Sequence, residues 1–108
     1  MKLAILNTTI ATTDGVYEVE TISLKKAKEQ IELNKNNLLS AIGHESTAEI
    51  MSTLLNTNVE MNRIIFLQEP KQQALVFKLK GRPEEGKILS VEEIEKIGYE
   101  FKLMTRVN

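Results

Sequence analysis

Hydrophobic residues recur along this chain with a period of two in some segments and with helical spacing in others. The order of these segments limits the possible folds more than any other feature. Residues 15–23 and 99–107 alternate with a period of two, which indicates strands. Residues 24–33 instead carry apolar side chains at helical spacing, and Ser23 in front of them is a suitable N-cap. Strands and helices intermixed in this way predict a protein of the α/β class.

Similar signals place the remaining elements. We expect further strands at residues 2–7, 62–69 and 73–81, and further helices at residues 38–43, 47–56 and 91–98. Ser46 with Glu49, and Ser90 with Glu93, have the form of capping boxes that would open the last two helices. Pro70 between two predicted strands indicates a hairpin, and hence a mixed sheet. The chain, residues 1–108, is therefore predicted to be a single α/β domain with a mixed sheet of about five strands flanked by helices.

The composition describes the core and the setting of the protein. Hydrophobic residues make up 42% of the 108 residues, whereas aromatic residues make up 5% and Trp is absent. The core should therefore be aliphatic, and we expect Met51, Met61 and Met104 to belong to it. No apolar run approaches the ~20 residues that span a bilayer. We accordingly expect a cytoplasmic protein that does not bind membranes.

Residue usage and charge exclude several kinds of site. The chain has no Cys and one His, so it lacks the ligands for a disulfide, a thiolate metal site or a zinc site. We therefore expect neither a metal nor another cofactor. The net charge of −1 argues against a DNA-coating protein, which usually carries a basic excess. It suits a small anionic ligand, because a few local Arg and Lys side chains can hold phosphates.

His44, the only histidine, stands two residues before the expected cap Ser46. The N-terminus of a helix offers free amides and the positive end of the helix dipole to an anion. An imidazole at its rim can donate a proton near neutral pH. However, a lone histidine near a helix cap is more often without a chemical role, and the residues alone leave both interpretations open.

Three features would have to converge for chemistry at this position, namely His44, Arg63 and the polar turn from Arg82 to Lys87. Cleavage of an RNA phosphodiester without metal needs a ribose 2′-hydroxyl held in line with phosphorus. It also needs cations or amides for the phosphoryl oxygens and an acid for the leaving 5′-oxygen. Because RNA supplies its own nucleophile, one His and one or two Arg could suffice.

Three motifs, IGHEST at 42–47, NRIIFL at 62–67 and RPEEGKILSVEEI at 82–94, occur in an order that resembles a small viral and mobile-element family. That family includes the type III anti-CRISPR ring nucleases. The resemblance implies a homodimer with a mixed sheet flanked by helices. It also implies that cyclic tetra-adenylate binds across the two-fold axis and is cleaved without metal. Attack by 2′-hydroxyls would then yield linear di-adenylates with 2′,3′-cyclic phosphates.

The same resemblance assigns roles to individual residues. His44 matches the general acid, and Glu85 and Arg82 match residues that line the site. Arg63 matches another basic position, and Asn7 falls near the ligand-facing end of the first strand. We therefore predict His44 and Glu85 as catalytic residues, and Asn7, Arg63 and Arg82 as ligand-binding residues.

Two other functions are compatible with the residues. One is a dimer that captures a cyclic nucleotide without cleaving it. The other is a protein of a mobile element that inhibits a host protein through an exposed face. The motifs favour the enzyme, but the ordinary charge and the lone histidine would suit any of the three.

Overall fold

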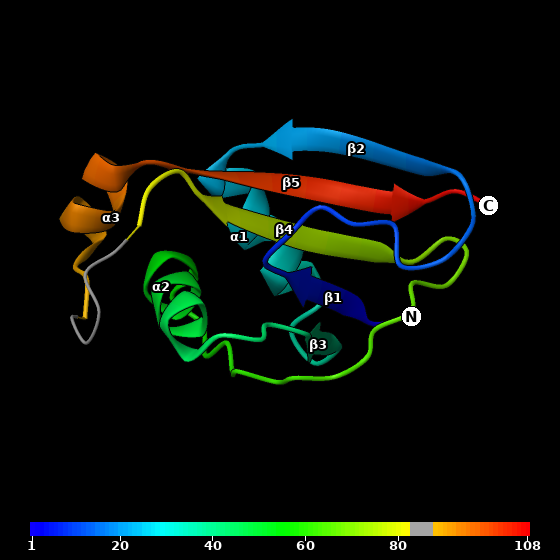
Figure 1. Ribbon diagram of the computed structural model, residues 1–108, viewed down its shortest axis with the longest axis horizontal. Helices are drawn as coiled ribbons and strands as arrows, with labels where there is room; N and C mark the ends of the chain where they lie inside the picture. Colours follow the sequence, from blue (N-terminus) through cyan, green and yellow to red (C-terminus); the bar gives the residue numbers. More distant parts are fainter. Residues whose placement is uncertain (83–87) are drawn as a thin grey trace.

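The computed structural model describes residues 1–82 and 88–108. In these ranges the elements are β1 (Leu3–Leu6), β2 (Tyr17–Ile22), α1 (Leu24–Leu33), β3 (Leu38–Ser40), α2 (Glu45–Leu55), β4 (Gln73–Leu79), α3 (Val91–Ile97) and β5 (Tyr99–Arg106). The described strands form one five-stranded sheet in the order β2-β5-β4-β1-β3 (Figure 1). The predicted α/β class and mixed sheet are confirmed.

The sheet combines a parallel half and an antiparallel half. β1 lies between β3 and β4 and is parallel to both, so that Ile5 pairs with Ser40 on one side and with Leu75 on the other. β5 is antiparallel to β4 and to β2. The carboxyl ends of β1, β3 and β4 therefore lie at the same edge of the sheet.

The main core lies between the sheet and the helices. Ala27 and Ile31 of α1, Met51 of α2 and Ile94 of α3 belong to one cluster of buried residues with the inward side chains of the strands. Phe77 on β4 packs against Phe101 on β5 with ring centroids 5.2 Å apart. Met51 and Met104 are buried as expected, whereas Met61 is 46% exposed and does not belong to the core.

Extended segments, rather than helices, cover part of the other face of the sheet. A smaller cluster there contains Ala4, Leu6, Ala74, Val76 and Met104, with Phe66 packed against it. The segment after β1 crosses in front of the sheet in Figure 1, while α1 lies behind it.

Hydrogen bonds of Gln68 connect two extended segments, residues 8–16 and 62–69. The Gln68 main-chain N donates to Thr12 Oγ1 at 2.8 Å, and Thr13 Oγ1 donates to the Gln68 carbonyl at 3.0 Å. Arg106 Nη1 also donates to that carbonyl, at 2.7 Å. The Gln68 side chain is buried and donates to the carbonyls of Gln72 and Met104.

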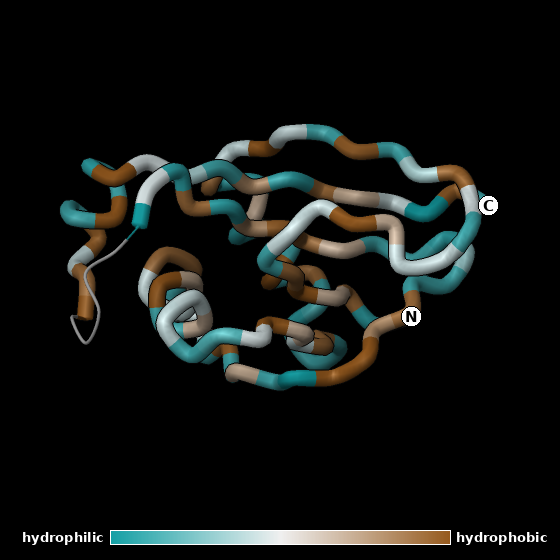
Figure 2. Tube along the Cα trace, viewed as in Figure 1, coloured by the Kyte–Doolittle hydropathy of each residue, from teal (hydrophilic) through white to brown (hydrophobic). Residues whose placement is uncertain are grey.

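The prediction of a hairpin around Pro70 was wrong. Residues 62–69 are all described and form no strand. Their backbone does not pair with a neighbouring strand, and the Gln68 main-chain N donates to the Thr12 hydroxyl instead. Ile64, Ile65 and Leu67 point outward. Figure 2 shows the middle of this segment, residues 64–67, as a hydrophobic stretch along the outside of the molecule. The mixed character of the sheet arises instead from β4 and β5, which α3 connects.

The prediction of a short helix at residues 38–43 was also wrong. Leu38–Ser40 form strand β3 beside β1, and Ile42 makes an isolated bridge to Met61. A run of four or five apolar and small residues fits a helix or a strand equally well. The free edge of β1 decided between them, because it offers backbone partners that an isolated helical turn does not have.

No helix in the described ranges is long and apolar enough to cross a membrane.

Candidate functional site

The candidate site begins at the N-terminus of α2. The bridge between Ile42 and Met61 keeps the chain extended up to His44, which has φ −131° and ψ 130° and is itself the N-cap. The His44 carbonyl accepts the Ala48 amide at 3.1 Å. The predicted capping box of Ser46 and Glu49 is therefore wrong, because the helix starts one residue before Ser46, at Glu45.

This start leaves the first turn of α2 open. The His44 side chain makes no capping hydrogen bond, and Ser46 and Thr47 lie inside the first turn, where main-chain amides have no partner within the helix. By contrast, Ser90 and Glu93 form the predicted capping box of α3, and Ser23 caps α1 by accepting the Lys26 amide at 3.1 Å. An open N-terminus attracts anions through its amides and its dipole.

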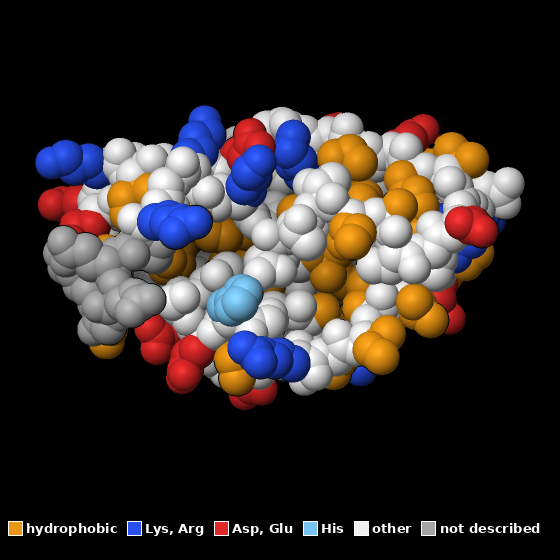
Figure 3. Space-filling model, in the orientation of Figure 1, with side chains coloured by type: hydrophobic (Ala, Val, Ile, Leu, Met, Phe, Trp, Pro, Cys, Tyr) orange, Lys and Arg blue, Asp and Glu red, His pale blue; other side chains and the backbone are white. Residues whose placement is uncertain are grey.

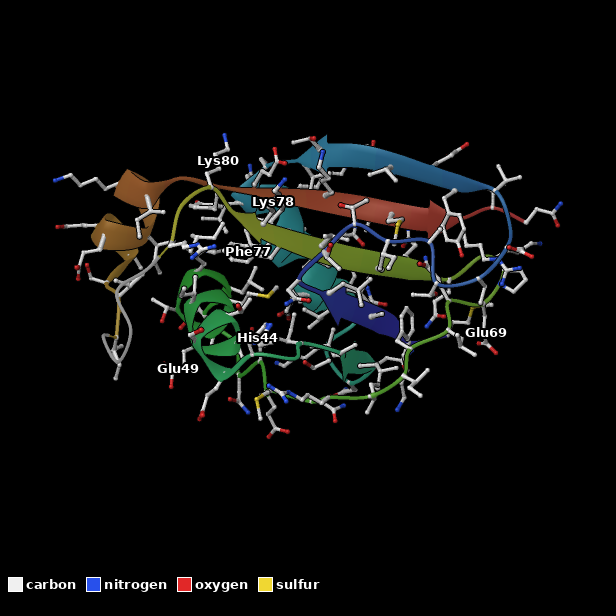
Figure 4. All side chains as sticks on the ribbon, in the orientation of Figure 1. His44, Glu49, Glu69, Phe77, Lys78 and Lys80 are labelled. Atoms are coloured by element: carbon white, nitrogen blue, oxygen red, sulfur yellow. The ribbon has the colours of Figure 1, made fainter. Side chains whose placement is uncertain are left out.

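A pocket of about 260 Å³ adjoins this helix end. Its lining combines polar and charged groups with an apolar floor, and comprises Asn7, Ser46, Thr47, Ile50, Phe77, Lys78, Leu79, Gly81 and Arg82. Figure 4 labels Phe77 and Lys78 on β4 and His44 at the beginning of α2. Tyr99 supports the floor, since its ring centroid lies 6.0 Å from that of Phe77. Burial raises the pKa of the Tyr99 phenol, and the Glu95 carboxylate adds to the rise.

The sheet topology explains why the predicted residues meet here. Asn7 follows β1, His44 follows β3 and Arg82 follows β4, and the carboxyl ends of these parallel strands share one edge. Ligands of α/β sheets bind outside this edge. Asn7 and Arg82 line the pocket itself, whereas His44 does not line it and stands two residues before Ser46, which does.

Arg63 lies beside the histidine rather than in the lining of the pocket. Its Nε donates to the Gly43 carbonyl at 2.7 Å, so the guanidinium holds the residue that precedes His44. Figure 3 shows the histidine exposed on the face of the molecule, with Lys or Arg side chains below it and farther above it. Glu85, the other predicted catalytic residue, lies outside the described residues.

Sequence reasoning missed the hydroxyl and charged side chains that Ser46, Thr47 and Lys78 contribute to the pocket. The sequence predicts Ser46 as part of a capping box, Thr47 as the start of a helix and Lys78 only as part of the strand at residues 73–81. The signal for Lys78 was weak, because strands commonly carry a lysine at a solvent-facing position. Its place at the end of β4, next to the edge where the other site residues lie, appears only once the sheet is assembled.

Two larger depressions suit an anion less well. One, of about 310 Å³, lies along β3 and the segment from Asn58 to Asn62. The other, of about 520 Å³, lies against α2 and is lined by Glu45, Glu49 and Glu60. Three carboxylates would repel a phosphate, so size does not identify the site here. In the described ranges no group of three or more His, Asp or Glu side chains could hold a metal ion.

Comparisons with known proteins identify relatives of the whole chain. The family model described as STIV B116-like matches residues 3–101. YddF of Bacillus subtilis (strain 168) is 35% identical over 108 residues, which cover 100% of both chains. ORF117 of Acidianus two-tailed virus is 34% identical over 92 residues, covering 84% of this chain and 79% of the viral protein. In structure, B116 of Sulfolobus turreted icosahedral virus superimposes with a TM-score of 0.84 at 25% identity, covering 96% of this chain and 98% of B116.

Proposed function

This chain belongs to the STIV B116-like family, and we propose that it is a metal-independent phosphodiesterase that degrades cyclic tetra-adenylate. The products would be linear di-adenylates with 2′,3′-cyclic phosphates, and the reaction would counter type III CRISPR signalling. The resemblance of its motifs to the ring nucleases supplies the substrate. One observation carries the proposal: the open N-terminus of α2, with His44 as its N-cap, adjoins a pocket that contains Arg82.

In the proposed cleavage each part of the reaction is assigned to a group at the site. A ribose 2′-oxygen forms a bond to phosphorus while the bond from phosphorus to the 5′-oxygen breaks. His44 gives a proton to the 5′-oxygen, and the proton of the 2′-hydroxyl passes to solvent. Arg82, Asn7 and the amides of the α2 N-terminus stabilise the charge on the phosphoryl oxygens. Glu85 orients the attacking hydroxyl in this proposal.

The size of the pocket favours a homodimer. About 260 Å³ is less than the ~300–1,000 Å³ of typical small-molecule sites, whereas the proposed ligand contains four nucleotides. One subunit would therefore hold only part of the ring. That part would include one of the phosphodiester groups that are cleaved. Two copies related by a two-fold axis make the same contacts twice and match the symmetry of the ligand.

An exposed apolar surface provides a candidate interface for the second copy. We call it the apolar ridge, and define it as the exposed side chains of Ile10, Val16, Ile64, Ile65 and Leu67. It lies on the two extended segments that Gln68 joins, and hydrophobic side chains gather on the face shown in Figure 3. His44 is exposed on the same face, so pairing through the ridge would bring the two sites toward each other.

The decisive experiment is an incubation with cyclic tetra-adenylate in the presence of EDTA, with chromatography of the products. The wild type should form linear di-adenylates with cyclic phosphate ends. His44→Ala should bind the ring and turn it over about 10²–10⁴-fold more slowly, the usual loss when general acid help is removed. Glu69→Ala is the control, because Glu69 is exposed at the far end of the sheet (Figure 4).

Each alternative outcome has a defined meaning. Cleavage by His44→Ala at the wild-type rate would remove the histidine from the mechanism. Binding with the ring recovered intact from the wild type would identify a capturing dimer. A host protein that is retained by a variant lacking both His44 and Arg82 would identify a protein-interaction inhibitor, provided that the ring neither binds nor reacts.

A further inference from the structure

Lys78 is the charged residue of the pocket to which neither the motifs nor the proposed mechanism gives a role. It is exposed at the end of β4, on the face of the sheet that the helices leave open, and it lines the pocket together with Arg82, Ser46 and Thr47. Figure 4 shows Lys78 and Lys80 close together along the chain, but Lys80 does not line the pocket.

The charge of Lys78 has no counterpart among the described residues. Its neighbour across the sheet is Glu100. However, the Glu100 carboxylate lies 3.8 Å from Lys102 Nζ, which also donates to Thr21 Oγ1 at 3.2 Å. The ion-pair partner of Glu100 is therefore Lys102 and not Lys78. Within residues 1–82 and 88–108, no ion pair or hydrogen bond engages the Lys78 ammonium or the Arg82 guanidinium.

These two cations stand where a helix least favours them. Positive side chains are unfavourable near the N-terminus of a helix, because the dipole and the free amides there are already positive. No side chain accepts a capping hydrogen bond at the N-terminus of α2, although Glu45 contributes one negative charge to its first turn. A protein that keeps such an arrangement gives up some stability for it, which is typical of functional sites. An anion in the pocket would relieve both unfavourable features at once.

We propose that Lys78 is a phosphate-binding residue, and that the scissile phosphodiester lies between Lys78 and the first amides of α2. This inference rests on the proposed function for the nature of the ligand. In this arrangement Lys78 is a second cation beside Arg82. The non-bridging oxygens of the phosphate then face β4. The ligand class is a phosphate ester whose oxygens meet a cation on the strand side and main-chain amides on the helix side.

The test compares Lys78→Gln with Lys80→Gln. Both variants remove one positive charge from the same end of β4, and Lys80 is an exposed residue whose main-chain N pairs with the Gly98 carbonyl. Binding of cyclic tetra-adenylate and of inorganic pyrophosphate is measured by calorimetry at several salt concentrations, and thermal unfolding is measured without ligand.

Lys78→Gln should weaken binding about tenfold or more, as expected for the loss of a charged hydrogen bond. Its salt dependence should be shallower than that of the wild type. Its unfolding temperature should be unchanged or higher, a result that a purely structural lysine would not give. Lys80→Gln should bind like the wild type.

The outcomes separate this inference from the proposed function. If wild type cleaves cyclic tetra-adenylate and Lys78→Gln binds it equally well, the role of Lys78 is refuted and the enzyme stands. If wild type binds pyrophosphate but does not process the ring, and Lys78→Gln weakens that binding, the phosphate site stands and the proposed substrate is refuted. If neither probe binds the wild type, both ideas are refuted. A lower unfolding temperature for Lys78→Gln would also contradict the inference.

Discussion

Arg63 is a predicted ligand-binding residue that does not line the pocket. Its Nε instead donates to the Gly43 carbonyl at 2.7 Å, directly before His44. A guanidinium has a planar fork that can fix a carbonyl in one direction, which a lysine ammonium cannot do. The contact favours Arg63 as a residue that fixes the path of the chain into His44.

This role predicts a particular kinetic pattern. Arg63→Ala and Arg63→Lys should both lower kcat, by about tenfold or more, because each loses the charged hydrogen bond to Gly43. The KM for cyclic tetra-adenylate should change little. Steady-state kinetics with both variants measures the two constants separately.

Phosphate binding would give a different pattern. Arg63→Lys would then keep most of the activity, since lysine retains the charge, and Arg63→Ala would mainly raise KM and flatten the salt dependence of binding. That result would return Arg63 to its predicted role as a ligand-binding residue.

At the scale of elements, α2 and α3 differ at their N-termini. The N-terminus of α3 is closed by a capping box, whereas that of α2 has no side-chain cap. Ser90 accepts the Glu93 amide at 3.2 Å, and Glu93 Oε1 accepts the Ser90 amide at the same distance. α2 has the same four-residue pattern in Ser46 and Glu49, yet it starts one residue before Ser46. The two motifs are alike in sequence and differ in use.

Stability measurements should reveal this difference. Ser90→Ala should lower the free energy of unfolding by about 0.5–2 kcal/mol, because it removes an N-cap hydrogen bond. Ser46→Ala is the matched substitution and should change the free energy of unfolding little, because Ser46 is no cap. Urea titrations of both variants measure the effect. An equal loss in the two variants would mean that Ser46 caps α2 after all.

At the scale of the whole molecule, the apolar ridge decides whether the proposed dimer can form. Ile65 is 92% exposed on the helix-free side, whereas Leu33 is 78% exposed at the end of α1. Both residues are large, apolar and surrounded by solvent in the single chain. Neither contributes to the core, so a charged replacement should leave the fold intact.

These two positions make a matched pair for testing the interface. Ile65→Asp should convert the proposed dimer to a monomer in sedimentation experiments, because it would bury a charge between the copies. It should also weaken binding of cyclic tetra-adenylate, since each pocket would lose its counterpart. Leu33→Asp should remain dimeric and active. A dimeric Ile65→Asp with full binding would exclude the ridge as the interface.

The sequence predicted those elements whose signals lie within a few neighbouring residues. β2 and β5 follow from alternation, and the N-caps Ser23 and Ser90 follow from side chains that bond amides three residues away. β3 and the extended segment 62–69 could not be predicted in this way. Their apolar runs are short, and distant partners in β1 and at Thr12 decided their conformations.

The sequence by itself determined the class of the fold, the aliphatic core and the identity of the rare chemical groups, because composition and periodicity act locally. Only the tertiary structure decided that Asn7, His44 and Arg82 belong to one edge. The reason is the order β4-β1-β3, which brings together strand ends that are far apart along the chain. The same order made Lys78 part of the pocket and left the first turn of α2 open to it.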